Sequence, residues 1–289
     1  MQRLSPLLIG VASTLLAFLA IVGAALLYGT RIGRHRLRLR EVEIEIPGLP
    51  EPFDGYRIVQ LSDFHIGGRG WSAEIMRRAV ALARRQRGDL IVLTGDYVET
   101  TPGIAAWTGL FGGLTAPDGV LAVLGNHDYQ NAGVRTAALV RAMGDEGIRV
   151  LRNESWRVRR NGQDLWLVGL DDPYSGHDNL LKAAANLPRE ARPIMLVHYP
   201  DFTWRLAPDR WALALCGHAH GSQVRLPIIG WYARARIAQT RFSHGLYQIN
   251  RIPVFVTTGV GTSGRPVRLR ARPEVVTIRL RAAPSTVRG

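Results

Sequence analysis

The sequence predicts a layered α/β domain that follows one N-terminal transmembrane helix. An uncharged apolar segment of 23 residues, Leu7 to Gly29, predicts the helix. Through the rest of the chain, apolar runs of strand length alternate with longer amphipathic stretches. Several of these runs are followed directly by aspartate, asparagine or histidine. This pattern is typical of strands packed between helices, with polar side chains meeting at the strand ends.

The N-terminal segment is long enough to remain in a membrane. As a helix it would span roughly 35 Å at about 1.5 Å per residue, which covers a bilayer core. It exceeds the apolar region of about 7–15 residues in cleaved signal peptides, and no persuasive cleavage site follows it. Only Arg3 precedes the span, whereas arginines cluster after it. The positive-inside rule therefore predicts a single-pass protein of the inner (cytoplasmic) membrane, with the C-terminal domain in the cytoplasm.

The positive charge of the chain favours a lipid partner. The formal net charge is +14, and Lys182 is the only lysine. Because an arginine bias often follows genome base composition, the position of the arginines is more informative than their number. We expect those next to the span to contact anionic lipid headgroups, each contributing on the order of 1 kcal/mol. They are Arg31, Arg34, Arg36, Arg38 and Arg40. Aromatic residues interleaved with basic ones are not evident, which argues against nucleic acid as a partner.

The first elements of the domain are expected in the order strand, strand, helix. Arg36 to Ile46 alternates charged and apolar residues, and the alternation changes parity at Arg40-Glu41. We therefore expect a half-exposed strand with a bulge or a break there. Tyr56 to Leu61 is a buried strand, and Ser72 is placed to cap a helix that extends to about Arg87. The apolar face of this helix contains Ile75, Met76, Ala79, Val80 and Ala83.

The remaining elements continue the alternation. Strands are expected at Leu90 to Leu93, Val120 to Leu124, Asp164 to Leu170, Ile194 to Val197, Leu213 to Leu215, Val254 to Val256 and Val275 to Leu280, with a helix near Val134 to Met143. Between residues 222 and 250, apolar side chains mix with arginines, and two interpretations stay open: an apolar rim that faces lipid, or an ordinary hairpin. The side chains concerned are Leu226, Ile228, Ile229, Trp231 and Tyr232.

Five short motifs after these strands carry side chains that bind metal ions. Carboxylate oxygens and imidazole nitrogens suit Mn, Fe, Zn or similar ions. The two oxygens of Asp96 can bridge ions about 3.5–4 Å apart, and Asn126 offers a neutral oxygen. Each motif alone is a weak signal, but their joint occurrence behind apolar runs predicts a site for two metals. The motifs are Asp63-Phe64-His65, Gly95-Asp96, Gly125-Asn126-His127-Asp128, His198 and Gly217-His218-Ala219-His220.

Together the motifs resemble those of the calcineurin-like metallophosphoesterase superfamily over roughly Arg57 to Leu280. The resemblance implies a four-layer α/β/β/α sandwich, here preceded by one N-terminal transmembrane helix. It also implies two divalent metal ions (Mn, Zn or Fe), with Asp96 as the bridge. His127 would approach the leaving-group oxygen or the phosphate, and Asp128 would orient its imidazole. The first ion would be held by Asp63, His65 and His220, and the second by Asn126, His198 and His218.

We divide the chain into a membrane anchor with its basic segment, residues 1–40, and a catalytic domain, residues 41–289. The anchor, the segment Gly169 to Pro173, and Thr258 to Gly264 with Pro266 and Arg268 resemble the membrane-anchored YaeI/YkuE-type bacterial branch. Related enzymes hydrolyse UDP-2,3-diacylglucosamine in lipid A synthesis. The resemblance therefore implies that metal-activated water hydrolyses a phosphodiester or pyrophosphate bond in a lipid-linked substrate.

Several alternatives to this function remain. The chain could be a phosphodiesterase or phosphatase for soluble nucleotides or phosphoproteins, a nuclease, or a non-catalytic metal-binding scaffold. The intact His127 argues against the scaffold, which has no need of a leaving-group histidine. The single cysteine, Cys216, excludes an internal disulfide framework. Metal identity, oligomeric state and physiological substrate are left open by the sequence.

Overall fold

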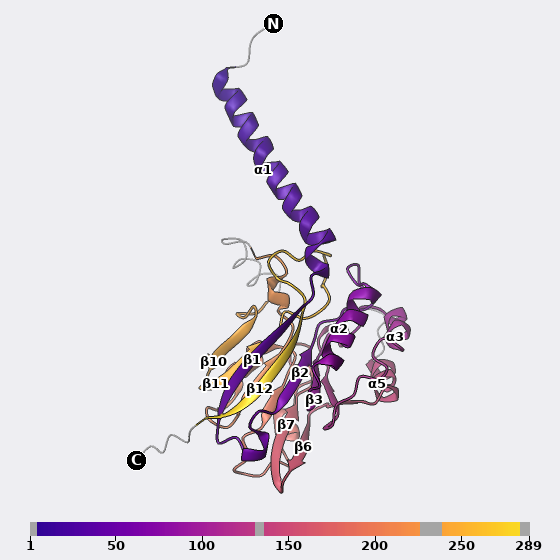
Figure 1. Ribbon diagram of the computed structural model, residues 1–289, viewed down its shortest axis with the longest axis vertical. Helices are drawn as coiled ribbons and strands as arrows, with labels where there is room; N and C mark the ends of the chain where they lie inside the picture. Colours follow the sequence, from indigo (N-terminus) through magenta and orange to yellow (C-terminus); the bar gives the residue numbers. More distant parts are fainter. Residues whose placement is uncertain (1–4, 131–135, 226–238, 284–289) are drawn as a thin grey trace, which may run out of the picture.

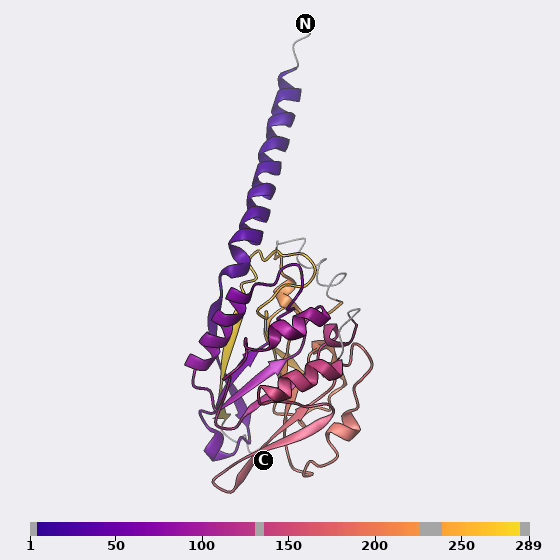
Figure 2. The same ribbon diagram turned by 90° about the vertical axis from the view of Figure 1, so that its right-hand side faces the viewer.

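The computed structural model describes residues 5–130, 136–225 and 239–283, in which one long helix leads into two facing sheets (Figures 1 and 2). The prediction of an α/β domain behind a single N-terminal apolar helix is confirmed. The apolar side chains between Leu226 and Tyr232, for which a lipid-facing rim or a hairpin was expected, lie outside the described residues.

Two six-stranded sheets form the described part of the domain. In spatial order, the first sheet contains β1 (Arg38–Pro47), β12 (Glu274–Ala283), β2 (Arg57–Leu61), β3 (Leu90–Thr94), β4 (Val120–Val123) and β5 (Ile148–Val150). The second contains β10 (Gly245–Ile249), β11 (Ile252–Val256), β9 (Leu213–Cys216), β8 (Ile194–Leu196), β7 (Gln163–Gly169) and β6 (Glu154–Arg160). Strands β2 to β5 are parallel, and so are β7, β8, β9 and β11. The carboxyl ends of the parallel strands in each sheet therefore meet at one edge.

Alternating side chains of the strands separate three apolar cores. Val59 and Leu61 face the helices α2 (Ala73–Arg85), α3 (Thr101–Trp107) and α5 (Thr136–Asp145), which cover the outer side of the first sheet (Figure 1). Ile58 points the other way, into the core between the two sheets. A third core lies outside the second sheet, beneath α6 (Leu180–Ala183) and the 3₁₀ helix η3 (Pro200–Arg205). The result is the expected four-layer sandwich, with a fourth layer of short helical turns and loops.

Helix α2 follows the prediction from its apolar spacing. Its five buried side chains are those expected: Ile75, Met76, Ala79, Val80 and Ala83. Ser72 occupies the N-cap position, but its side chain does not form the expected capping hydrogen bond. The helix ends at Arg85, slightly before the expected end, because Arg87 has a positive φ of 48° and turns the chain toward β3.

The predicted bulge at Arg40-Glu41 is wrong. β1 pairs with β12 in one continuous parallel register that begins with Arg38 opposite Glu274. Arg38 and Arg40 occupy the face that apolar residues take further along the strand, because successive side chains alternate in direction. Each arginine has a partner there: Arg38 forms an ion pair of 2.6 Å with the buried Glu274, and Arg40 lies 5.1 Å from the ring centre of Phe255. Because these two arginines point inward, the alternation of charged and apolar residues changes phase in the sequence although the strand itself is unbroken.

Three strands, β5, β6 and β10, were not expected from the sequence. β5 is a three-residue strand at the edge of the first sheet. β6 and β10 each lie at an edge of the second sheet and pair antiparallel with the strand that follows them in the chain. In β6 only Val158 is buried, and the other six residues are half-buried or exposed. An edge strand that faces solvent lacks the continuous apolar run that marks a central strand.

The topology brings the metal-binding motifs to the end of the domain where the N-terminal helix enters. Helix α1 (Pro6–Arg31) and the short η1 (Gly33–His35) lead directly into β1, so Arg38 lies at this end. Arg38 is opposite the first residue of β12, and β12 is antiparallel to β2. The carboxyl end of β2, followed by Asp63, is therefore near the base of α1. Strands β3 and β4 end at the same edge, and both views show α1 projecting away from it (Figures 1 and 2).

Helix α1 has the length and composition of a membrane span. Residues Pro6–His35 reach a mean hydropathy of 2.5 in their most apolar window, and none of that window is buried in the domain. Leu7, Leu16 and Ile21 are each more than two-thirds exposed. Exposing a continuous apolar helix to water is unfavourable, whereas a bilayer would cover it. The helix therefore supports membrane anchoring.

Candidate metal centre

The polar motifs after β2, β3 and β9 lie on strained backbone. Asp63, His65, Asp96, His218 and His220 all have a positive φ, between 48° and 69°. Residues with a Cβ seldom adopt this region, at a cost of about 1–3 kcal/mol each, and such residues gather at functional sites. Here the left-handed turns direct five side chains toward one place at the strand ends.

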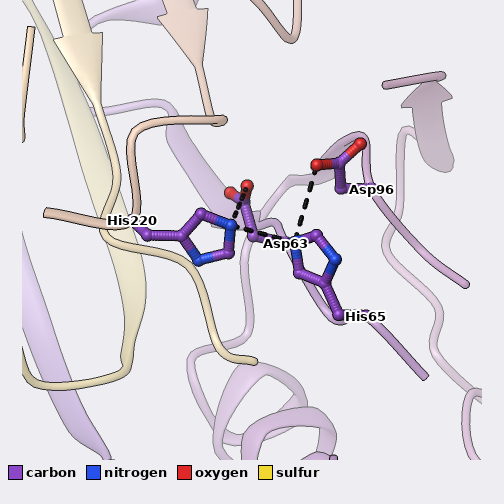
Figure 3. A group of neighbouring side chains, drawn as sticks. All are labelled: Asp63, His65, Asp96 and His220. Carbon is purple, nitrogen blue, oxygen red and sulfur yellow. Dashed lines mark hydrogen bonds and ion pairs between the residues drawn. The ribbon is translucent and has the colours of Figure 1, made fainter. Parts of the chain in front are cut away.

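A first cluster consists of Asp63, His65, Asp96 and His220, whose donor atoms all lie within 4.8 Å of one another. Figure 3 shows the side chains converging from loops far apart in the sequence. The Nε2 atoms of His65 and His220 are 2.9 Å apart, and Nε2 of His220 is 3.3 Å from Oδ1 of Asp63. Nε2 of His65 is 3.5 Å from Oδ2 of Asp96. All four residues are buried. This is the group expected around the first ion, together with the expected bridge.

A second cluster shares Asp96 with the first and adds His198 and His218. Nε2 of His198 is 3.2 Å from Oδ2 of Asp96 and 3.3 Å from Nδ1 of His218. The amide oxygen of Asn126 is 3.0 Å from the same Nδ1 atom. The three residues expected around the second ion therefore come together. Asp96 Oδ2 faces both clusters, as a bridging carboxylate must.

The donor atoms fit a pair of cations. Oδ2 of Asp63 is buried and has no hydrogen-bond partner within the described part of the chain. A buried carboxylate oxygen left in this way is costly unless a cation meets it. Nδ1 of His198 donates a hydrogen bond of 2.7 Å to the carbonyl of Thr94, which leaves the lone pair of Nε2 directed at the cluster. Imidazole and carboxylate together suit divalent transition-metal ions.

The carboxylates govern the electrostatics of these clusters. Burial would lower the pKa of His198, but the charge and hydrogen bond of Asp96 raise it to about 10. Burial would raise the pKa of Asp96, whereas His198 and His127 hold it well below its ordinary value. The site therefore attracts positive charge. Metal ions that bind here would replace protons, because an imidazole ligand must be neutral.

His127 lies at the mouth of the site, next to an acid that the sequence analysis missed. Its side chain is 25% exposed, compared with 1% for His65. Oε1 of Glu99 is 3.2 Å from Nδ1 of His127 and 2.6 Å from Nδ1 of His65. Burial would lower the pKa of His127, but Asp96 and Glu99 raise it to about 9. Both carboxylates therefore favour the protonated form of the imidazole, the form that can donate a proton.

Glu99 connects the predicted leaving-group histidine to a predicted metal ligand. Burial would raise the pKa of Glu99, but its hydrogen bonds with His127 and His65 lower it to about 2. The only sequence signal for this role is an acid three positions after Asp96. Nothing local shows that the loop at 96–99 pairs with the loop at 63–66; the structure shows it in the hydrogen bond from Glu99 N to the carbonyl of Ile66, 2.8 Å.

The role predicted for Asp128 requires a correction. Its carboxylate does not orient the imidazole of His127 but accepts backbone N–H groups, at 2.9 Å from Gly125 and Tyr97 and 3.0 Å from Asp96. The physical reason is that two loops turn sharply at the rim and leave their N–H groups without backbone partners. The fully buried Asp128 satisfies them and so joins the loop after β3 to the loop after β4.

The segment from Thr258 to Gly264 supports the first cluster from behind. Gly261 donates a hydrogen bond of 2.7 Å to the carbonyl of Asp63. A Cβ at Gly259 would lie 2.5 Å from Cβ of Asp63, and one at Gly261 would lie 2.1 Å from the carbonyl oxygen of Phe64. Only glycine allows this close approach. The segment used to recognise the bacterial branch is therefore part of the wall of the site.

A two-sheet α/β fold whose strand ends gather two sets of metal-binding side chains, beside a more exposed histidine, defines a metal-dependent phosphoesterase. Residues 56–222 match the calcineurin-like phosphoesterase family. The chain belongs to this family.

Relatives of known name support the same assignment. The chain is 32% identical over 228 residues to phosphodiesterase YaeI of Escherichia coli (strain K12), covering 78% of this chain and 82% of that protein. It is 29% identical over 277 residues to the uncharacterized metallophosphoesterase YkuE of Bacillus subtilis (strain 168), covering 94% and 96%. It is also 29% identical over 278 residues to a transmembrane protein with metallophosphoesterase domain of Danio rerio, covering 92% and 62%. The resemblance to the YaeI/YkuE-type branch is confirmed.

Proposed function

We propose that this phosphoesterase is anchored in the cytoplasmic membrane and hydrolyses a phosphodiester or pyrophosphate bond in a lipid-linked substrate such as UDP-2,3-diacylglucosamine. The observation that carries the proposal is the position of α1, which enters the domain at the edge that carries both metal clusters. An active site at this edge lies close to the surface in which the anchor sits. A substrate held in the same surface by acyl chains reaches the site by lateral diffusion.

In this proposal Asp63, His65 and His220 would hold one divalent ion, and Asn126, His198 and His218 would hold the other. Asp96, whose Oδ2 faces both clusters, would serve both ions. When bound, the ions polarise the phosphate oxygens and activate a water molecule. Their identity among Mn, Zn and Fe follows from availability as much as from the ligands.

The residues around the ligands complete the chemistry. His127, which is more exposed than the ligands and lies beside Glu99, would donate a proton to the oxygen that leaves phosphorus. Glu99 holds the Nδ1 side of that imidazole, which directs Nε2 toward the substrate. Asp128 fixes the backbone on which His127 and Asp96 sit.

Some of the arginines expected to contact lipid headgroups are occupied by contacts within the protein. Arg38 is paired with Glu274, and Arg34 donates to the carbonyl of Gly70 at 3.1 Å. Arg31 and Arg36 are exposed, as is Arg265 on the loop beside the helix base. We therefore assign headgroup contacts to Arg31, Arg36 and Arg265 rather than to the whole run from Arg31 to Arg40. The arginine excess after the span supports a cytoplasmic catalytic domain.

The experiment compares full-length protein and substrate in the same vesicles with protein and substrate in separate vesicles, in the presence of Mn²⁺. A site confined to the membrane surface should hydrolyse UDP-2,3-diacylglucosamine at least tenfold faster when both share a bilayer. The soluble diester bis-p-nitrophenyl phosphate serves as a control, because its hydrolysis should not depend on the arrangement. Asp96→Asn in both arrangements corrects for contaminating activity.

Two outcomes would count against the lipid substrate. Hydrolysis of a cyclic nucleotide but not of the lipid nucleotide would favour the soluble-substrate alternative. Cleavage of single-stranded DNA alone would favour a nuclease. The membrane orientation has its own test, a reporter fused after Gly289: activity of a reporter that works only in the periplasm would reverse the predicted topology.

A further inference from the structure

Arg268 is buried beneath the metal centre but is not one of the proposed metal ligands or catalytic residues. Its side chain is among the largest that are fully enclosed, and it is 1% exposed. Within the described residues no carboxylate forms an ion pair with it. An isolated buried guanidinium is costly, so its retention needs hydrogen bonds to most of its N–H groups.

The guanidinium is held by main-chain carbonyls of the wall around the first cluster. Nε donates to the carbonyl of Gly261 at 2.9 Å, Nη1 to Ala271 at 3.1 Å and Nη2 to Thr258 at 2.8 Å. Nη2 also lies 3.5 Å from Nδ1 of His220. Because Nε2 of His220 faces the metal cluster, Nδ1 must keep its proton when a metal binds, so this contact is packing between the two groups and not a hydrogen bond. These bonds fix the segment that presses on Asp63 and place a planar group behind His220. Lysine cannot reproduce them, because its ammonium is a single point without the fork of five donors.

The main chain of the same residue is fastened to the anchor helix. The backbone N–H of Arg268 donates a hydrogen bond of 3.1 Å to the carbonyl of Gly29, in the last turn of α1. A Cβ at Gly33 would lie 2.1 Å from the carbonyl oxygen of Arg268, and one at Gly29 would lie 2.8 Å from Val267. The helix base therefore rests directly on this residue, and glycine is required for the contact.

The neighbouring residue continues the connection toward the ligand loop. Leu269 N donates to the carbonyl of Gln223 at 2.7 Å, and Arg225 N donates to the carbonyl of Leu269 at 3.0 Å. Gln223 directly follows η4 (His220–Ser222), which begins with the ligand His220. Backbone and side chain thus lead from the base of α1 to the same histidine.

We propose that Arg268 is a positioning residue that joins the anchor helix to the metal centre: the base of α1 fixes its main chain, and its guanidinium, through the carbonyls of Thr258 and Gly261, holds the wall that packs against Asp63 and His220 in the geometry that binds the first ion. The inference rests on the proposed metal ligands and not on the identity of the substrate. It makes the junction between α1 and the domain part of the metal site.

The test measures Mn²⁺ binding by the full-length protein in detergent, without any phosphate substrate. Elemental analysis gives the number of ions bound, titration gives their dissociation constants, and electron paramagnetic resonance distinguishes a coupled pair from a single ion. We expect Arg268→Lys to weaken one of the two Mn²⁺ sites by about 10- to 100-fold, the usual effect of removing a group that orients a metal ligand. The signal of the coupled pair should give way to that of a single ion.

Matched variants distinguish an effect of the contact between α1 and Arg268 from a general loss of stability. Gly33→Val should weaken the same site, because its side chain must displace the main chain of Arg268. Gly23→Val lies on the same helix, where an added Cβ meets nothing within 4 Å, and should bind two ions normally. Arg69→Lys changes an exposed arginine next to Gly70, which packs against Pro266 of the same loop, and should also be normal.

Each result decides the proposal. Two ions bound with unchanged affinity by Arg268→Lys or by Gly33→Val would overturn it, and so would an equal loss in Gly23→Val. If Arg268→Lys does not fold, Gly33→Ala, which adds one methyl group at the contact, decides in its place by the same measurement. Failure of UDP-2,3-diacylglucosamine hydrolysis with these Mn²⁺ results intact would refute the proposed substrate alone.

Discussion

Left-handed backbone is formed by glycine at several turns away from α1 and by the metal-binding residues at the anchor end. At the end away from α1, Gly48, Gly55 and Gly119 have a positive φ, and a Cβ at any of them would meet nothing within 4 Å. At the anchor end, aspartates and histidines such as Asp63 and His220 adopt the positive φ. Gly259 and Gly261 there serve a different purpose, since they admit the chain segment that carries Asp63.

This difference shows where the molecule gives up stability for function. A turn without a functional task can use glycine and avoid the strain of a left-handed Cβ. A ligand must carry a side chain, so the strain remains and the neighbouring loops must maintain it. Asp128, the 258–264 segment and Arg268 supply that support. Substitutions at the anchor end should therefore affect metal binding and catalysis, whereas those at the far end should affect stability alone.

The largest expected effect belongs to Asp96. Asp96→Asn removes the charge shared by the two clusters, so we expect hydrolysis to fall by roughly 1000-fold or more, equivalent to at least about 4 kcal/mol of transition-state stabilisation. Bound metal should fall from two ions to one or none. The control is Asp54→Asn, an exposed carboxylate at the far end that should leave both quantities unchanged. Unaltered turnover in Asp96→Asn would refute the assigned bridge.

His127→Ala should separate catalysis from metal binding. Losing a general acid costs roughly 100- to 10,000-fold in kcat, and both metal ions should remain bound. The adjacent Asp128→Ala should instead lower the thermal unfolding temperature, because it leaves several buried backbone N–H groups without an acceptor. Elemental analysis, kcat and thermal unfolding measured on both variants check the distinction. Loss of metal from His127→Ala would make that residue a ligand rather than an acid.

A smaller effect is expected for Glu99→Gln. The amide keeps an oxygen beside both imidazoles but loses the charge, so we expect a 10- to 100-fold loss of metal affinity or activity, typical for groups that orient metal ligands. Metal affinity should fall because Glu99 orients the ligand His65, and kcat should fall because Glu99 also orients His127. Glu51→Gln, an exposed glutamate at the far end, is the matched control and should behave as the unmodified protein. Normal affinity and normal kcat in Glu99→Gln would show that its contacts have no functional part.

The smallest effects come from a pair of glycines with nearly equal φ. Gly48→Ala adds a methyl group in open space at φ +74°, so it should cost only the backbone strain of about 1–2 kcal/mol. Gly259→Ala has the same strain at φ +67° and also presses on Asp63. The thermal unfolding temperature should fall by a few degrees in both variants, at about 2–4 °C for each kcal/mol of lost stability. Only Gly259→Ala should lose Mn²⁺, and equal metal content in the two variants would contradict the contrast between the ends.

The sequence predicted best those elements whose apolar spacing follows directly from which side chains are buried. The five apolar residues of α2 and the central strands follow from period and burial, and the polar motifs follow those strands directly. It was least informative at edges and loops. The polar β6 was missed because only one face of it is covered, and the parity of β1 was misjudged because arginines took inward positions.

By itself the sequence determined the chemistry of this protein: aspartate, asparagine and histidine after apolar strands, in an order that belongs to one family of phosphoesterases, behind a segment long enough to span a membrane. Only the tertiary structure decided which groups support that chemistry. Glu99 meets His65 across 34 residues, and Arg268 meets His220 across 48. Such contacts depend on how loops turn after the strands end, and left-handed turns at aspartate and histidine leave only a weak local signal in the sequence.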